Sequence, residues 1–155
     1  MQTFRADDTK GQIAFDRFCK LLKSKGVNYR NASMEEQYNG IDLVTELRSY
    51  EVKHQSFKDK IVIEEDSMKG EGSGWIYTSL ADMIVEVGDN SLLMIDRGQL
   101  KAFYIAVKDN YTLLYNEYTK GLRGDEWRSS YRIIPISHIM PYVTCKEIIL
   151  VGESV

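Results

Sequence analysis

The chain has 155 residues, of which 43% are hydrophobic and 28% charged, and its formal net charge is −3. This composition fits one globular domain over residues 1–155 and excludes a fibrous, low-complexity or extensively disordered protein. No run approaches the roughly 20 apolar residues that span a bilayer, and the first residues lack a secretory pattern, so we expect a cytoplasmic protein with no membrane partner.

Charge is distributed unevenly along the chain. Residues 1–30 carry seven basic and three acidic side chains, whereas residues 31–110 carry fifteen acidic and eight basic ones. The pattern fits solvated helix and loop surfaces. It also fits a basic helix that holds a phosphate backbone beside acids that bind divalent cations. On that second interpretation, Lys10, Arg17 and Lys20 are the candidates for nucleic-acid contact.

The first predicted element is a helix from Thr9 to Lys25. Thr9 and Gln12 fit a capping box at its start, and apolar residues recur at helical spacing between them and the end. Gly26 is typical of the left-handed residue that ends a helix. The basic residues fall mostly off the apolar stripe.

Three short strands are predicted next, at Ile41–Thr45, Tyr50–His54 and from Lys60 to Ile63 or Glu64. Close connections favour antiparallel pairing among them. Residues 66–74 contain three glycines and are predicted to form a mobile loop of the kind that closes over substrate.

The second half of the chain alternates between helix and strand. Predicted elements are a short helix over Ser79–Met83, strands at Ile84–Val87 and Leu92–Ile95, a helix over Arg97–Lys108, an irregular stretch over residues 110–130, and strands at Arg132–Ile134 and Ile148–Val151. This order predicts a three-layer α/β fold in which a central mixed β-sheet is flanked by helices.

The residues that carry chemistry lie in the first two predicted strands. Alternate side chains of a strand share a face, so Glu51 and Lys53 project together, and a turn brings Asp42 alongside them. Two carboxylates suit Mg²⁺ or Mn²⁺, which lower the pKa of an attacking water and neutralise charge in phosphodiester hydrolysis. Lys53 is expected to orient that water, help to deprotonate it or stabilise developing charge.

This spacing resembles the PD-(D/E)XK nuclease superfamily, which shares an Asp, a spacer, then Glu-X-Lys on adjoining strands. Here the motif is Asp42, eight residues, then Glu51-Val52-Lys53, with Ile41 in place of the motif's proline. Residues 36–42 and 74–82 are similar to small nuclease-like proteins of bacteriophages, so a cytoplasmic location would be the host's. The resemblance implies a restriction-endonuclease-like fold and a metal-dependent DNA endonuclease, of which a resolvase-like enzyme acting on branched DNA is one form.

Further site residues are expected with an ordinary structural alternative beside each. The resemblance implies an additional acid on the first helix, where Asp16 is the candidate metal ligand or a solvated charge. Gln55 follows Lys53 by two residues and is a candidate catalytic side chain or an ordinary strand residue. Glu64 or Glu65 is expected either to reach the site or to face solvent at a strand end.

Aromatic side chains are frequent in two regions and have two possible uses. They either stack on bases or pack in the core or an oligomer interface. The residues concerned are Trp75, Tyr77, Tyr111, Tyr115, Tyr118, Trp127 and Tyr131. A homodimer is plausible because symmetric subunits supply two sites for cleavage of both strands.

Two other functions remain open on the sequence. The first is a binding protein that retains a nuclease scaffold without turnover and recognises a nucleic acid or a protein, as in phage counter-defence. The second is an interaction protein in which Glu51 and Lys53 pair across solvent, where such a pair is worth about 0 to 1 kcal/mol.

Overall fold

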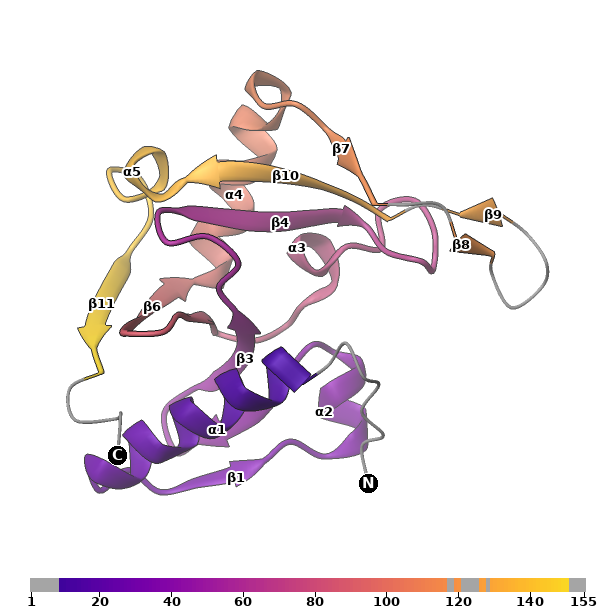
Figure 1. Ribbon diagram of the computed structural model, residues 1–155. Helices are drawn as coiled ribbons and strands as arrows, with labels where there is room; N and C mark the ends of the chain where they lie inside the picture. The colour runs from indigo at the N-terminus through magenta and orange to yellow at the C-terminus, as the bar shows by residue number, and fades with distance from the viewer. Residues whose placement is uncertain (1–8, 117–118, 121–125, 128, 151–155) are drawn as a thin grey trace.

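The fold is that of a computed structural model, which describes residues 9–116, 119–120, 126–127 and 129–150 (Figure 1). Its helices are α1 (Thr9–Ser24), α2 (Met34–Tyr38), α3 (Trp75–Thr78), α4 (Arg97–Val107), η2 (Lys108–Asn110) and α5 (Ile136–Ile139). The strands are β1 (Tyr29–Asn31), β2 (Leu43–Thr45), β3 (Ser49–His54), β4 (Lys60–Asp66), β5 (Met83–Val87), β6 (Ser91–Asp96), β7 (Leu114–Tyr115), β8 (Thr119–Lys120), β9 (Glu126–Trp127), β10 (Ser130–Pro135) and β11 (Cys145–Ile149).

A six-stranded mixed sheet forms the centre of the molecule, with the strand order β1-β2-β3-β5-β6-β11. The first three strands are antiparallel neighbours, β3 and β5 run parallel, and β6 and β11 continue antiparallel. The predicted α/β fold with a central mixed sheet is therefore confirmed. A second sheet has the order β4-β10-β7, and β8 pairs with β9.

Different elements cover the two faces of the central sheet (Figure 1). Helix α1 packs on one face, where Phe18 and Leu22 join Tyr50, Val85 and Leu92 in one core cluster. A second cluster on the opposite face combines the sheet with side chains from β4, α3, α4, β10 and α5. The second layer thus contains a β-sheet as well as helices, which the sequence analysis did not anticipate.

Helix α1 agrees closely with its prediction. It begins at Thr9 and ends at Ser24, and Gly26 has a φ of +71°, as expected for a left-handed residue at the end of a helix. Gln12 donates a hydrogen bond of 2.8 Å to Asp16. The residue before Thr9 lies outside the described residues, so the capping box stays a prediction.

The pairing predicted for the third strand is wrong. Strand β4 does not pair with β3. It pairs antiparallel with β10, which lies far along the chain. Its alternating residues Ile61 and Ile63 are fully buried in the second core cluster. The free energy gained by burying this apolar face outweighs the advantage of pairing β4 with β3 across their short connection.

The short helix near residue 80 also lies elsewhere than predicted. Helix α3 spans Trp75–Thr78, and Ser79 ends it with an extended backbone. Leu80 then donates its N–H to the carbonyl of Asn39 at 2.8 Å. Residues 79–82 therefore form tertiary backbone hydrogen bonds instead of a helical turn. Strand β1 and helix α2 were not predicted at all, although Ser33 and Glu36 form a capping box at the start of α2.

Candidate active site

Asp42 lies at the point where the pairing of β2 and β3 ends, and this place positions the first candidate side chain. The backbone N–H of Asp42 donates to the carbonyl of Tyr50 at 2.8 Å, which extends the pairing by one step. One step further, the Asp42 carboxylate accepts the backbone N–H of Val52 at 2.8 Å. A side chain thus replaces the missing strand partner and is held beside the middle of β3.

Glu51 and Lys53 project from β3 toward the second sheet, as the strand alternation predicts. Tyr50 lies on the other face, where its ring packs against Phe18 with a centroid distance of 5.1 Å. The Lys53 Nζ lies 3.0 Å from Glu51 Oε2, and the two side chains are 23% and 12% exposed. The pair is largely buried, so it differs from the solvent-exposed pair of the interaction-protein alternative.

Glu86 is a further acid at this site that the sequence analysis missed. It lies on β5 as the register partner of Lys53 and is 3% exposed. No hydrogen bond or ion pair joins its carboxylate to another described residue. The signal was available in the sequence, because Glu86 interrupts an otherwise apolar strand, Met-Ile-Val-Glu-Val, in which every residue is buried.

The electrostatics of the site reflect burial of several acids around one ammonium group. Burial raises the pKa of Asp42 to about 6 against the hydrogen bond from Val52, and it raises the pKa of Glu86 to about 7. Burial opposes the charge of Lys53, but the nearby carboxylates Glu51, Glu86 and Asp42 outweigh it and raise the pKa of that ammonium. In the described part of the chain, the acids of this cluster therefore outnumber the cationic groups beside them.

Helix α3 brings Trp75 against the cluster. The Lys53 Nζ lies 4.6 Å from the centroid of the Trp75 ring, within the range of a cation–π contact. The helix is pressed onto β4, since the N–H of Gly74 donates to the Glu65 carbonyl at 3.0 Å. A β-carbon at Gly74 would collide with the carbonyl of Glu64. The absence of a side chain at this position allows the close approach.

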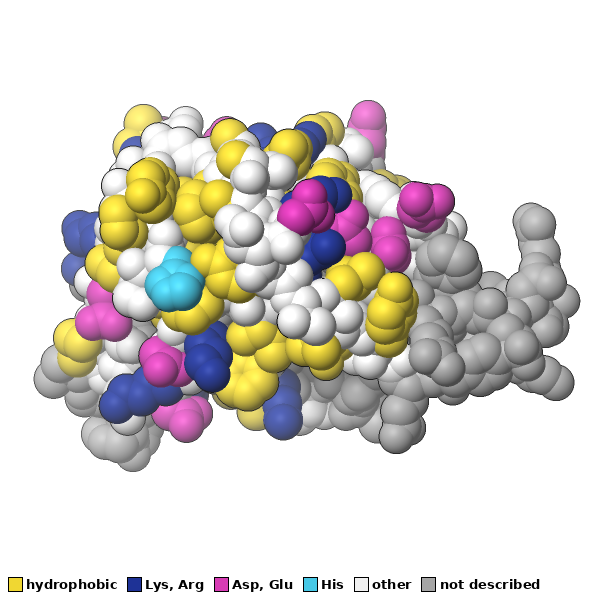
Figure 2. Space-filling view, turned by 90° about the horizontal axis from the view of Figure 1, so that it is seen from above, with side chains coloured by type: hydrophobic (Ala, Val, Ile, Leu, Met, Phe, Trp, Pro, Cys, Tyr) yellow, Lys and Arg dark blue, Asp and Glu magenta, His cyan; other side chains and the backbone are white. Residues whose placement is uncertain are grey.

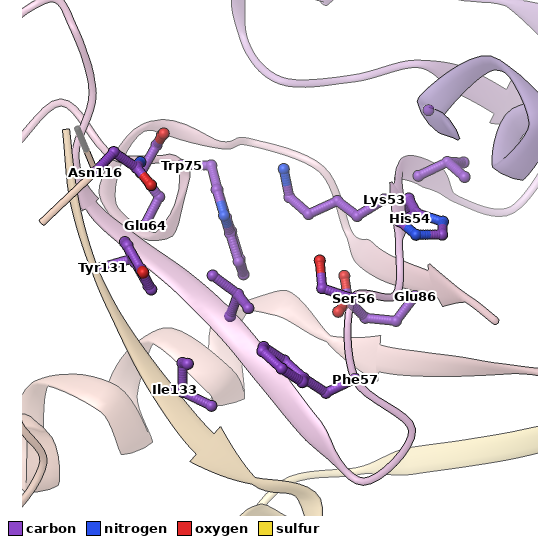
Figure 3. Close-up of a pocket in the computed structure, with 13 residues that line it drawn as sticks. Lys53, His54, Ser56, Phe57, Glu64, Trp75, Glu86, Asn116, Tyr131 and Ile133 are labelled. Atoms are coloured by element: carbon purple, nitrogen blue, oxygen red, sulfur yellow. The ribbon is translucent and has the colours of Figure 1, made fainter. Parts of the chain in front are cut away.

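A pocket of about 570 Å³ opens beside Lys53 between β3 and the second sheet (Figure 3). Its polar lining includes Lys53, Glu64 and Glu86, and burial raises the pKa of Glu64. Its aromatic lining comprises Phe57, Trp75 and Tyr131. Charged and aromatic groups thus converge on one cavity, a usual property of binding and active sites.

Glu65, the neighbour of Glu64 on β4, faces the opposite way into a separate polar network. Its carboxylate accepts hydrogen bonds from the hydroxyls of Tyr77 at 2.8 Å and Tyr104 at 2.6 Å, and from Arg132 at 2.8 Å. Lys108 lies 3.7 Å away. Of the two acids expected near the site, the structure brings Glu64 to the pocket and directs Glu65 away from it.

Other predicted residues do not join the cluster in this structure. Gln55 donates to the Lys58 carbonyl at 3.2 Å, and exposed Asp16 is bonded to Gln12. Arg17 donates to the Gly88 carbonyl at 3.0 Å. Their expected catalytic, metal-binding and nucleic-acid roles remain predictions.

Two of the three basic residues expected to contact a nucleic acid are exposed on α1. Lys10 and Lys20 both reach solvent, and Gly11, next to Lys10, lines the pocket. Figure 2 shows the opposite side of the molecule, which carries α4, α5 and β10, and there acidic and basic side chains are interspersed with hydrophobic ones.

The aromatic residues have different fates. Trp75 and Tyr131 line the pocket, whereas Tyr77 serves the Glu65 network and Tyr111 bonds to His138 at 2.8 Å. Tyr115 is exposed. Tyr118 and the side chain of Trp127 lie outside the described residues.

Within the described residues, no group of three or more His, Cys, Asp or Glu side chains is arranged to hold a metal ion. None of the helices described is long and apolar enough to cross a bilayer. Comparisons with protein-family models, curated proteins and solved structures found no match. The geometry of the site is therefore the basis for assigning a function.

Proposed function

We propose that this chain is a Mg²⁺- or Mn²⁺-dependent nuclease that hydrolyses phosphodiester bonds in DNA at a site formed by Asp42, Glu51 and Lys53. The observation that carries the proposal is an unsatisfied acid beside a buried ammonium group. Glu51 Oε1 is buried without a hydrogen-bond partner among the described residues, while Oε2 pairs with Lys53. Native proteins rarely leave a buried polar atom unpaired without a functional reason.

The acids of the site fit a hard divalent cation. Mg²⁺ is usually held by one or two carboxylates and keeps several waters, so a complete cage of protein ligands is not required. Glu51 and Asp42 would hold the ion, because each offers a carboxylate oxygen beyond the one engaged with Lys53 or Val52. When bound, such an ion lowers the pKa of water and neutralises charge on the phosphate.

The protein groups then have distinct tasks. Asp42 is held in place by its hydrogen bond to β3, so its position does not depend on the substrate. The raised pKa of Lys53 keeps its ammonium protonated at neutral pH, which suits stabilisation of developing negative charge better than removal of a proton from water. Trp75 covers the ammonium and reduces its contact with solvent.

The arrangement of strands supports membership of the PD-(D/E)XK superfamily. Asp42 directly precedes β2, Glu51 and Lys53 lie in β3, and these strands are antiparallel neighbours. The superfamily motif calls for this placement of Asp and Glu-X-Lys on adjoining strands. A restriction-endonuclease-like fold is therefore the finer architecture that we propose.

The test compares the wild-type chain with Lys53→Met, which keeps the length of the side chain but removes its charge. Supercoiled plasmid and branched DNA are incubated with Mg²⁺, Mn²⁺ or a chelator. We expect metal-dependent cleavage that falls roughly 100- to 1000-fold in the variant. Lys58→Met, at an exposed position, is the matched control and should cleave normally. Sedimentation of the active protein would test for the expected homodimer.

A binding protein on the same scaffold is the second candidate. The observation that favours it is the closed Glu51–Lys53 ion pair of 3.0 Å, which already occupies the ammonium group. Metal binding by folded protein without cleavage of DNA or RNA would select this candidate. Loss of cleavage in Lys53→Met with unchanged folding, measured by circular dichroism, would reject it.

A further inference from the structure

The pocket beside Lys53 points to the form of the substrate. Its volume of about 570 Å³ lies within the usual range for a site that encloses a small organic group. A phosphate group alone requires hydrogen-bond donors and cations, not an apolar enclosure. The lining includes Val62 and Ile133 beside the aromatic residues, so part of the cavity suits a flat, largely apolar group.

The aromatic side chains come from three separate segments. Phe57 follows β3, Trp75 begins α3 and Tyr131 lies in β10 (Figure 3). Phe57 is 42% exposed, although it lies beside a pocket that its ring could help to fill. Aromatic rings of this kind stack on unpaired bases with little regard to sequence, because every base has a flat π-face.

The recessed position of the reactive groups adds an independent constraint. The side chains of Glu51 and Lys53 are 12% and 23% exposed, and Glu86 is 3% exposed. Lys53 and Glu86 line the pocket, so a phosphate that reaches these two side chains enters the space between β3 and the second sheet. A base that is still paired and stacked in a duplex cannot follow its phosphate into such a cavity, whereas an unpaired nucleotide can.

We propose that the pocket lined by Phe57, Trp75 and Tyr131 accepts a base of an unpaired nucleotide, and that the substrate class is single-stranded or locally unpaired DNA. This inference takes the nature of the ligand from the proposed function. It goes further by excluding the intact duplex as the preferred substrate.

The experiment measures binding separately from cleavage. Fluorescein-labelled DNA of about 12 nucleotides, within the range of single-strand sites, is titrated as a single strand and as a duplex of the same sequence. Ca²⁺ replaces Mg²⁺ during anisotropy measurements because it also takes carboxylate oxygens. We expect the single strand to bind about tenfold more tightly than the duplex, and an unpaired stretch inside a duplex to restore binding.

Variants of Phe57 locate the interaction. Phe57→Ala and Phe57→Leu should each weaken single-strand binding by roughly fivefold or more and leave duplex binding unchanged, since both remove the ring. Phe57→Trp should retain the preference. The matched control is Tyr38→Ala, because Tyr38 is 78% exposed on α2 and does not line the pocket. No change in the single-strand preference of Phe57→Ala would overturn the assignment of the pocket.

The two proposals fail in distinguishable ways. Selective single-strand binding without cleavage in Mg²⁺ or Mn²⁺ would contradict the proposed nuclease function and support the pocket assignment. Cleavage of intact duplex at a rate equal to that of the single strand would support the nuclease and overturn the pocket assignment. Absence of binding to either DNA form, by folded protein, would overturn the assignment as well.

Discussion

Glu64 and Glu65 are consecutive residues of β4, yet they belong to buried regions with opposite electrostatic character. Glu65 receives hydrogen bonds from two tyrosines and an arginine, with Lys108 nearby. Glu64 faces the pocket, which Lys53 and Glu86 also line, and the carboxylates of Glu51, Glu86 and Asp42 all act on the Lys53 ammonium. A satisfied acid of the first kind fixes the fold, whereas an acid-rich cluster short of cations is a place for a ligand to supply charge.

The largest effect is expected where the Glu65 network, whose carboxylate is fully hydrogen-bonded, loses its arginine. Arg132→Met should lower the free energy of unfolding by about 3 to 5 kcal/mol, because the Glu65 carboxylate remains buried without its main cation. Urea denaturation measures the change. Arg48→Met, at an exposed position, is the control and should alter stability little. Equal stability of the two variants would show that the Glu65 network is not needed for the fold.

The second largest effect is expected when a divalent ion is added, because it should bind the acid-rich cluster and not the Glu65 network. At about 100 times its dissociation constant, Mg²⁺ should raise the free energy of unfolding by about 3 kcal/mol, since it binds the folded state. Glu51→Gln should remove most of this gain, as measured by thermal denaturation with and without Mg²⁺. Glu71→Gln, at an exposed loop position, should keep it. The same gain in Glu51→Gln would place the ion elsewhere.

The smallest predicted effect concerns Glu86 and has a defined pH dependence. A carboxyl whose pKa is raised by burial binds more protons when folded, so stability falls as pH rises from the unfolded pKa toward about 7. Glu86→Gln removes this loss and should stabilise the metal-free protein by about 1 to 3 kcal/mol above that pH. The advantage should disappear near the unfolded pKa of a glutamate, and denaturation across this pH range measures it. A constant difference at all pH values would contradict the assigned cause.

The sequence predicted the parts of the molecule that depend on local patterns. Helix α1, strand β3 and the sharing of a face by Glu51 and Lys53 follow from periodicity within single elements. The pairing of β4 with β10 was not predictable in this way, because it joins segments far apart in the sequence and depends on competition between burial and loop closure.

The same distinction applies to the candidate site. Asp42, Glu51 and Lys53 carry a recognisable spacing, whereas Trp75 approaches Lys53 only because α3 packs on β4. Glu86 gave a weaker local signal, a charge within an apolar strand, whose meaning depended on knowing that β5 lies beside β3. When a site is built from several segments, the role of each residue can be assigned only once the tertiary arrangement is known.

The contact between Gly74 and β4 has a consequence for how the molecule can vary. Because main chain meets main chain there, the separation between Trp75 and the opposite wall of the pocket is set by the backbone and not by any side chain that can be exchanged. Any larger residue at position 74 would displace the start of α3 from β4, while the apolar cluster around Phe18 on the far face of the central sheet would stay intact. Gly74 therefore fixes the distance between α3 and β4, and with it the width of the pocket beside Trp75.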